Sequence, residues 1–220
     1  MHQILKLGNG ALVCLTGIDG SGKTTHARSL VAFLGEKGYN CTYVWAASRP
    51  VFSLAFFGLT KVLGYWKKTK KGMYTDPLEF APSTVKGTLA VFWRLFLLVD
   101  FQVRVLATVR VRLLRGLVVV CDRYVYDMIM ELRASQLYTS TFEELATKMV
   151  PKPAVTFLLD VNVATARSRR GFNTEQLSMR RRAFLELARK FNFVIIDSNR
   201  DFVHNCSQIR TQTLSHLPRS

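Results

Sequence analysis

The sequence predicts an α/β fold with a five-stranded parallel sheet and helices on both faces. Five apolar, β-rich runs recur along the chain with helical stretches between them, at residues 11–16, 41–45, 117–121, 155–159 and 193–196. Strands that are apolar throughout are typical of a parallel sheet covered on both faces, which gives three layers. Crossovers should be right-handed, and ligands should bind at the carboxyl ends of the strands.

Length and composition limit the class of protein. With 220 residues, of which 49% are hydrophobic, the chain can bury one core, and we expect a single domain over residues 1–220. The start of the sequence shows no basic-then-apolar leader, and no uncharged run reaches the about eighteen residues of a spanning helix. We therefore expect a cytoplasmic protein without a transmembrane segment. The four cysteines form no C-x-x-C pair, so a zinc site is not indicated.

The net charge is +16, from 31 lysines and arginines against 15 aspartates and glutamates. Such a charge attracts nucleotides, nucleic acid and anionic lipid alike, so it does not select the partner. The basic residues gather in two places. Residues 167–182 hold six arginines and a single glutamate, and residues 66–71 hold four lysines. One cluster can serve catalysis while the other is merely solvated.

Residues 17–24 read G-x-x-x-x-G-K-T, the full Walker A pattern, between an apolar strand and a stretch with helical spacing. The glycines allow successive backbone N–H groups to turn toward an anion, and this context disfavours a Gly-Ser turn that fits by chance. Lys23 can reach the β- and γ-phosphates, and the Thr24 hydroxyl is suited to Mg²⁺. A nucleoside triphosphate is the expected ligand, held by Gly17, Asp19, Gly20, Ser21, Gly22, Lys23, Thr24 and Thr25.

The third apolar run ends in a carboxylate, in the sequence LVVVCDRY. Asp122 has the form of a Walker B acid and is expected to hold Mg²⁺ together with Thr24. The next residue, Arg123, puts a guanidinium beside the metal, where it can bind an acceptor phosphate through two N–H groups. A strand-end salt bridge is the structural alternative, which the presence of the Walker A loop makes less favoured.

In their order along the chain, these motifs resemble thymidylate kinases and their close relatives among the nucleoside monophosphate kinases. The resemblance covers most of the chain, from GIDGSGKTT through LLRGLVVVCDRYVYD to FLLDV and LELARKFNFVIID. It implies transfer of phosphate from ATP, with Mg²⁺, to a nucleoside monophosphate, dTMP being favoured, by a homodimer with no stable nucleic-acid partner. It also implies that Asp19 approaches the acceptor sugar. In ASRP (47–50) the family usually shows R-E-P, so Arg49 is displaced by one position and is expected at the acceptor phosphate.

A further cation is needed at the transferring phosphoryl group, because negative charge spreads over that group during transfer. The variable positions of the Walker A loop contain no arginine, so Lys23 and Arg123 need support from elsewhere. A lid at about residues 163–182 can supply it, as in family members that bring the charge from the lid. Its candidate catalytic residues are Arg167, Arg169 and Arg170, before a possible hinge at Gly171. For each arginine the alternative is a solvated basic helix face.

The acceptor-base end departs from the family pattern. Thymidylate kinases usually carry, on the helix before the D-R-Y strand, an arginine that reads thymine and an aromatic residue one turn earlier. Those positions are Phe101 and Leu97 here. Losing the bidentate contact of that arginine with the base would cost about 1–3 kcal/mol in discrimination between bases. We therefore expect the base to be recognised from shifted positions, by Phe96, Phe101 and Arg104. A kinase of another small molecule, whose headgroup suits Phe101, is the alternative.

The segment at about residues 51–115 is apolar and expected to be helical on the acceptor side. We interpret it as a helical part that packs on the sheet and on a twin subunit. The alternative is an apolar surface that meets a membrane or a lipid-like acceptor. Arg94 argues against a spanning helix, because a central charge costs at least ~2.5 kcal/mol, but a surface-lying helix is allowed.

For the protein as a whole, an alternative function of another class is a basic P-loop ATPase or binding module that engages nucleic acid or a membrane surface.

Overall fold

The strands form one parallel sheet with the order β2-β3-β1-β4-β5. This is seen in a computed structural model that describes residues 10–46, 88–134, 137–170 and 174–217. The strands of the described chain are β1 (Leu12–Thr16), β2 (Cys41–Trp45), β3 (Val118–Asp122), β4 (Val155–Asp160) and β5 (Val194–Asp197). Each strand begins and ends within one residue of its predicted range, and the predicted five-stranded parallel sheet is confirmed.

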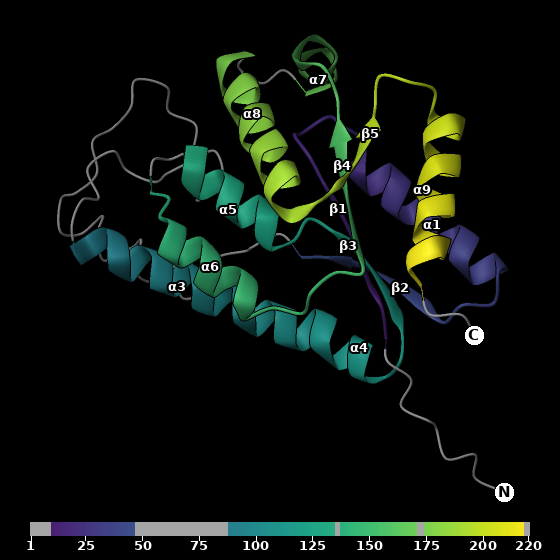
Figure 1. The fold of residues 1–220 in the computed structure, drawn as a ribbon, viewed down its shortest axis with the longest axis horizontal. Coiled ribbons are helices and arrows are strands. Elements are labelled where there is room, and N and C mark those ends of the chain that lie inside the picture. The colour runs from purple at the N-terminus through teal and green to yellow at the C-terminus, as the bar shows by residue number, and fades with distance from the viewer. Residues whose placement is uncertain (1–9, 47–87, 135–136, 171–173, 218–220) are drawn as a thin grey trace, which may run out of the picture.

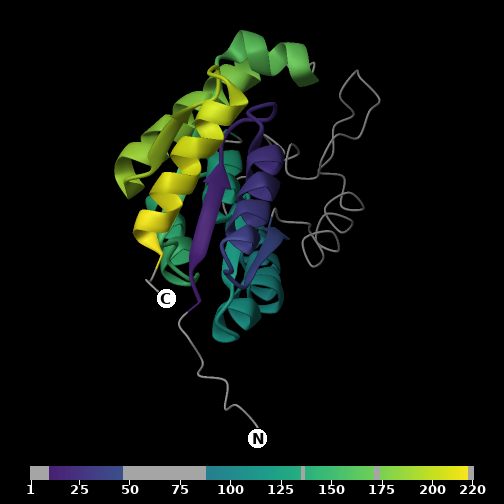
Figure 2. The same cartoon turned by 90° about the vertical axis from the view of Figure 1, so that its right-hand side faces the viewer.

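Helices cover both faces of the sheet, which confirms the predicted three-layer arrangement (Figures 1 and 2). In the described chain they are α1 (Lys23–Glu36), α3 (Thr88–Val105), the π-helix η1 (Leu106–Arg110), α4 (Val111–Leu114), α5 (Val125–Ala134), α6 (Ser140–Lys148), α7 (Val163–Arg170), α8 (Thr174–Phe191) and α9 (Phe202–His216). α1 and α9 pack side by side on one face, while α3, α5, α6 and α8 cover the other.

Alternate residues of the strands supply two separate cores. On β1, Val13 and Leu15 belong to the core beneath α1 and α9, whereas Leu12 and Cys14 belong to the core beneath α3, α5 and α8. This alternation follows from the pleat of a strand, which sends successive side chains to opposite faces. Burial on both sides explains why β1, β3 and β4 are largely apolar, and their parallel pairing places their carboxyl ends together at one end of the sheet.

α3, η1 and α4 form one helical run with a single widened turn in its middle. One row of buried side chains recurs at every fourth position, at Trp93, Leu97, Phe101, Val105 and Val109, and Leu98 and Asp100 are buried beside it. An α-helix turns about 100° per residue, so such a row drifts by about 40° at each step. The wider π-turn reduces this drift between Val105 and Val109 and keeps Val109 in the core.

Residues 88–115 of the predicted apolar segment are therefore helical for most of their length, as expected. Residues 51–87 of that segment lie outside the described residues. Within the part of the chain that the structure describes, no helix combines the length and the apolar character that crossing a bilayer requires.

Candidate functional site

The loop between β1 and α1 depends on glycine at both of its ends. Gly17 has φ 143° and Gly22, the N-cap of α1, has φ 89°, both in the region that favours glycine. A Cβ on Gly17 would lie 2.6 Å from the carbonyl oxygen of Leu159, closer than two such atoms can approach. The loop therefore follows a tight path beside β4. Because the first turn of α1 contains no acidic residue, its amide N–H groups can serve an anion.

Lys23 is the first residue of α1 and is 6% exposed. Its Nζ donates to the carbonyl oxygens of Gly17 at 2.7 Å and Ile18 at 2.9 Å. Burial, and after it the charge of Arg123, lower the pKa of Lys23 to about 8, while Asp19 acts in the opposite direction. A phosphate at the loop would stabilise the charged ammonium, so anion binding and protonation of Lys23 favour each other.

The two predicted metal ligands lie together. Thr24 Oγ1 donates to Asp122 Oδ2 at 2.6 Å, and the Tyr43 hydroxyl donates to the same oxygen at 2.8 Å. The other carboxylate oxygen, Asp122 Oδ1, is buried and accepts no hydrogen bond from the described residues. A hydroxyl and an unsatisfied carboxylate oxygen are the donors that Mg²⁺ prefers, so the residues present fit this ion. Burial and the bond to Asp122 raise the pKa of Tyr43 to about 12, which keeps it a donor.

Arg123 follows β3 in a backbone conformation that is rare for a residue with a side chain. Its φ is 67°, in the left-handed region. This turn directs the guanidinium toward the Walker A loop, where it donates to Asp19 Oδ1. The side chain of Arg123 is 26% exposed. The residue that follows Asp122 therefore faces the Walker A loop.

A buried carboxylate at the start of α5 holds this turn in place. Asp127 Oδ2 accepts hydrogen bonds from Thr16 Oγ1 at 2.8 Å and from the backbone N–H of Tyr124 at 3.0 Å. Thr16 ends β1 directly before the Walker A loop, and Tyr124 directly follows Arg123. Burial raises the pKa of Asp127, against the opposing effect of Arg123 and Lys23. Asp127 thus ties the phosphate loop to the turn that carries Arg123.

Asp19 lies among three cations. Besides Arg123, Lys23 Nζ lies 3.8 Å from its Oδ1, and Arg180 Nη1 of α8 lies 3.5 Å from its Oδ2. Burial acts to raise the pKa of Asp19, but Lys23, Arg123 and Arg180 outweigh it, so the pKa is lowered. The carboxylate stays ionised at neutral pH, and it can accept a hydrogen bond from a hydroxyl-bearing ligand.

These groups surround one cleft of about 470 Å³. Its lining comprises Asp19, Gly20, Gly22, Lys23, Thr24, Thr25, Trp45, Arg123 and Arg169. Trp45 ends β2, so the lining comes from the carboxyl ends of the strands, as expected for this fold. The guanidinium of Arg104 lies 5.8 Å from the centre of the Trp45 ring. A residue predicted on the acceptor side therefore packs against a wall of the cleft.

The structure separates the lid arginines from one another. Arg169 Nη1 donates to the carbonyl oxygen of Gly20 at 2.9 Å and so reaches the Walker A loop. Arg167 Nη1 donates instead to Thr174 Oγ1 at 3.2 Å and links α7 to α8. The side chain of Arg170 lies outside the described part of the chain. Of the two arginines whose side chains are described, Arg169 is the one that lines the cleft.

The base-reading candidates lie in different surroundings. Phe101 is fully buried and meets the ring of Tyr124 edge-on, with ring centres 5.9 Å apart. It supports the turn after β3 and does not line the cleft. Phe96 is half-buried on α3, directly before Leu97. Arg49 lies outside the described residues.

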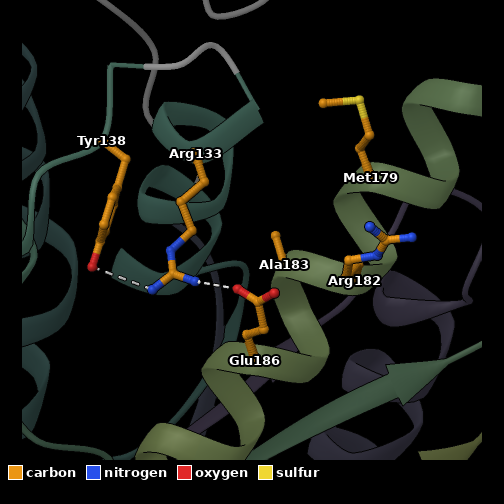
Figure 3. Close-up of a pocket in the computed structure, with 6 residues that line it drawn as sticks. All are labelled: Arg133, Tyr138, Met179, Arg182, Ala183 and Glu186. Carbon is orange, nitrogen blue, oxygen red and sulfur yellow. Dashed lines mark hydrogen bonds and ion pairs between the residues drawn. The ribbon is translucent and has the colours of Figure 1, made fainter.

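A second hollow, of about 400 Å³, lies apart from this cleft, between α5 and α8 (Figure 3). It is lined by Arg133, Tyr138, Met179, Arg182, Ala183 and Glu186. The Arg133 guanidinium points between Tyr138 and Glu186, bonding to the glutamate at 2.9 Å and lying 4.4 Å from the tyrosine ring centre. It also binds the buried Glu143 at 2.8 Å. These pairs join α5, α6 and α8, which gives the hollow a structural role.

Four residues of the site, Tyr43, Trp45, Asp127 and Arg180, were not predicted as site residues from the sequence. Tyr43 and Asp127 bind groups far away along the chain, and Arg180 was noted only as part of an arginine-rich stretch. Asp127 had a local indication, since a carboxylate three residues after Tyr124 has the spacing at which a side chain bonds back to the N-terminus of a helix. Tyr43 carried no comparable pattern.

Comparison with known proteins gives consistent matches. The family model "Thymidylate kinase" matches residues 93–209. The chain is 31% identical to a probable thymidylate kinase of Staphylothermus marinus over 218 residues, which cover 95% of this chain and 97% of the relative. It is 31% identical to a probable thymidylate kinase of Sulfurisphaera tokodaii, covering 84% and 86% of the two chains. It is 28% identical to a thymidylate kinase of Ruegeria pomeroyi, covering 97% and 99%.

Proposed function

Because this chain belongs to the thymidylate kinase family and is a nucleoside monophosphate kinase, we propose that it transfers the γ-phosphoryl group of ATP to dTMP. One observation supports this most. The Thr24–Asp122 bond and the Arg123–Asp19 ion pair bring the triphosphate loop and the D-R-Y arginine to a single cleft. Two phosphate groups bound there would meet end to end. The proposed setting is the cytoplasm, as expected from the sequence.

On the donor side, the loop amides and Lys23 would hold the triphosphate, and Thr24 with Asp122 would hold Mg²⁺. The ion, when bound, neutralises charge on the β- and γ-phosphate oxygens. Tyr43 keeps one oxygen of Asp122 oriented by its hydrogen bond, which leaves Oδ1 for the metal. Arg169 reaches the loop at Gly20, so among the predicted lid residues it is best placed to stabilise the transferring group, with Arg167 and Arg170 as further candidates.

On the acceptor side, Arg123 would bind the phosphate of the monophosphate, together with Arg49. A guanidinium has five N–H donors, so its pairing with Asp19 leaves donors for a phosphate. Asp19 would accept a hydrogen bond from the acceptor sugar. The buried position of Phe101 leaves Phe96, Arg104 and Trp45 as the described candidates for contact with the base.

An ADP-release assay with dTMP, dUMP, UMP, CMP and AMP tests this function. We expect selective stimulation by dTMP. Stimulation by a different monophosphate would keep the reaction class but overturn dTMP as the acceptor, and stimulation by none would contradict the proposal. Turnover driven by single-stranded DNA, RNA or anionic vesicles would favour a basic binding module instead.

A homodimer is the proposed assembly, and α3 carries the surface that supports it. Six apolar side chains of the helical run are between 45% and 57% exposed, at Val91, Phe92, Leu95, Val99, Val103 and Leu106. At 100° per residue they fall within about 120° of the helix circumference, opposite the buried row. A continuous apolar face of this kind can be buried against the same face of a second copy in an isologous interface.

We predict that Val99→Asp combined with Val103→Asp yields a monomer, because each carboxylate would be buried without a partner in the interface. Size-exclusion chromatography with light scattering measures the change. Leu145→Asp is the matched control, since Leu145 is a 43% exposed apolar residue on a different helix, α6. A monomeric wild-type protein, or a double variant that remains dimeric, would contradict the proposed interface.

A further inference from the structure

Arg180 joins three elements at the edge of the cleft. It lies on α8 with only 10% of its side chain exposed. Its Nη1 lies 3.5 Å from Oδ2 of Asp19 in the Walker A loop, and its Nη2 donates to Oε2 of Glu131 on α5 at 3.1 Å. The side chain of Glu131 is 13% exposed. One guanidinium thus links two carboxylates, Asp19 and Glu131, that are 112 positions apart in the sequence.

We propose that Arg180 is a positioning residue for Asp19 at the acceptor site, and that Glu131 in turn fixes the guanidinium of Arg180. This inference rests on the proposed function, in which Asp19 faces the acceptor sugar. It adds to that function a means by which α8, whose first half lies in the predicted lid, sets the geometry of the acceptor site.

The two oxygens of Asp19 explain the need for such a residue. Oδ1 is drawn toward Arg123 and Lys23, whereas Oδ2 has Arg180 as its cation. Without Arg180, the carboxylate is attracted from one side only and rotates toward Arg123. The guanidinium of Arg123 would then lose donors that the acceptor phosphate needs. A balanced Asp19 keeps both the sugar contact and the phosphate contact available.

The residue type fits this role. An arginine presents N–H donors in a planar fork, so Nη1 and Nη2 can serve two carboxylates in fixed directions. A lysine at the same place offers one compact charge on a flexible stem, which cannot hold both partners in the same geometry. Arg180→Lys should therefore restore only part of the function lost in Arg180→Met.

Glu131 makes the bridge formed by Asp19, Arg180 and Glu131 sensitive to pH. Burial above all, together with Asp19 and Asp127, raises the pKa of Glu131 to about 7 against the lowering effect of Arg180 and Arg123. The charged form that holds Arg180 is therefore present above about pH 7 and is lost as the pH falls through that value. In the wild type, the KM for dTMP should rise as the pH falls below about 7, and Glu131→Gln should remove this component.

Steady-state kinetics with both substrates test the bridge. We expect Arg180→Met to raise the KM for dTMP by about tenfold, the effect of losing one charge-assisted hydrogen bond, while the KM for ATP changes by less than about twofold. Arg182→Met is the control, because Arg182 is an exposed arginine of the same helix that lines the hollow of Figure 3. It should match the wild type in both constants.

The proposal is overturned if Arg180→Met leaves the KM for dTMP unchanged or raises both KM values equally. It is also overturned if Glu131→Gln keeps the pH profile of the wild type.

A wild-type protein that turns over no monophosphate would count against the proposed function, and thermal unfolding then tests the bridge without turnover. Because the folded pKa of Glu131 lies above its ordinary value of 4.5, Glu131 makes the protein less stable as the pH rises from about 5 to about 7. Glu131→Gln should flatten that part of the Tm profile, and an unchanged profile overturns the bridge.

Discussion

Lys23→Ala is expected to abolish phosphoryl transfer, with kcat falling by at least about 100- to 1,000-fold. That range is typical when one preorganised donor is removed from a charge that develops in a transition state. The ammonium of Lys23 sits against the loop carbonyls of Gly17 and Ile18 and is almost closed off from solvent, so water cannot take its place. An ADP-release assay at saturating ATP and dTMP measures the effect.

Two further variants show whether the loss is one of charge or of folding. Lys23→Met keeps the apolar stem without the ammonium, and it should be as inactive as the alanine variant with a Tm no lower than that of the wild type, because a buried charge is removed. Lys37→Ala changes an exposed lysine at the C-cap of the same helix and should keep wild-type kcat. A well-folded Lys23→Ala protein that retains more than about one tenth of the wild-type kcat would contradict the role of Lys23.

Arg123→Ala is expected to impair use of the acceptor while leaving ATP binding largely intact. Loss of its bonds to the acceptor phosphate should lower kcat/KM for dTMP by about 10- to 100-fold, since hydrogen bonds to charged groups contribute about 1.5–3 kcal/mol. The Walker A loop keeps its own path, because the hydrogen bonds from Lys23 to the carbonyl oxygens of Gly17 and Ile18 do not involve Arg123. Titration of ATP by calorimetry, beside kinetics with dTMP, separates the two effects. An equal loss of ATP affinity and acceptor use would contradict the assignment.

The backbone at Arg123 provides a matched control. At φ 67° an alanine is strained, whereas a glycine adopts this conformation freely. Arg123→Gly should therefore be as defective with dTMP as Arg123→Ala, yet more stable by about 1 kcal/mol in urea unfolding. If the glycine variant recovers acceptor use, the defect of the alanine variant comes from the backbone and not from the lost guanidinium.

The sheet could be predicted from the sequence because its information is local. A strand buried on both faces is apolar at every position, and a run of four to six such residues leaves little choice of boundary. The Walker A loop and the Asp122–Arg123 pair were predictable for the same reason, since each is a compact motif at the end of a strand. Family resemblance then supplied the reaction class, which the matches to thymidylate kinases support.

The long-range contacts of the remaining site residues are not encoded by a local pattern. The bond from Thr16 to Asp127 joins residues 111 positions apart, and the bond from Tyr43 to Asp122 joins residues 79 positions apart. The lid shows a related limit. Arg167 and Arg169 are two residues apart on one helix, so their side chains point about 200° apart, and only the three-dimensional arrangement decides which of them faces the cleft.

The π-turn between α3 and α4 has a consequence for tracing the evolution of acceptor choice. A turn of this kind accommodates one more residue than an α-helical turn, so the helix before it and the helix after it keep nearly the orientation that an α-helix with one residue fewer would give them. Removing a single residue from 106–110 would therefore restore an α-helical turn and leave the buried row and the exposed apolar face in place. Equivalent positions in relatives are best matched by their azimuth around this helix, because a one-residue insertion or deletion at this turn shifts the numbering while core, surface and ligand-facing positions stay where they are.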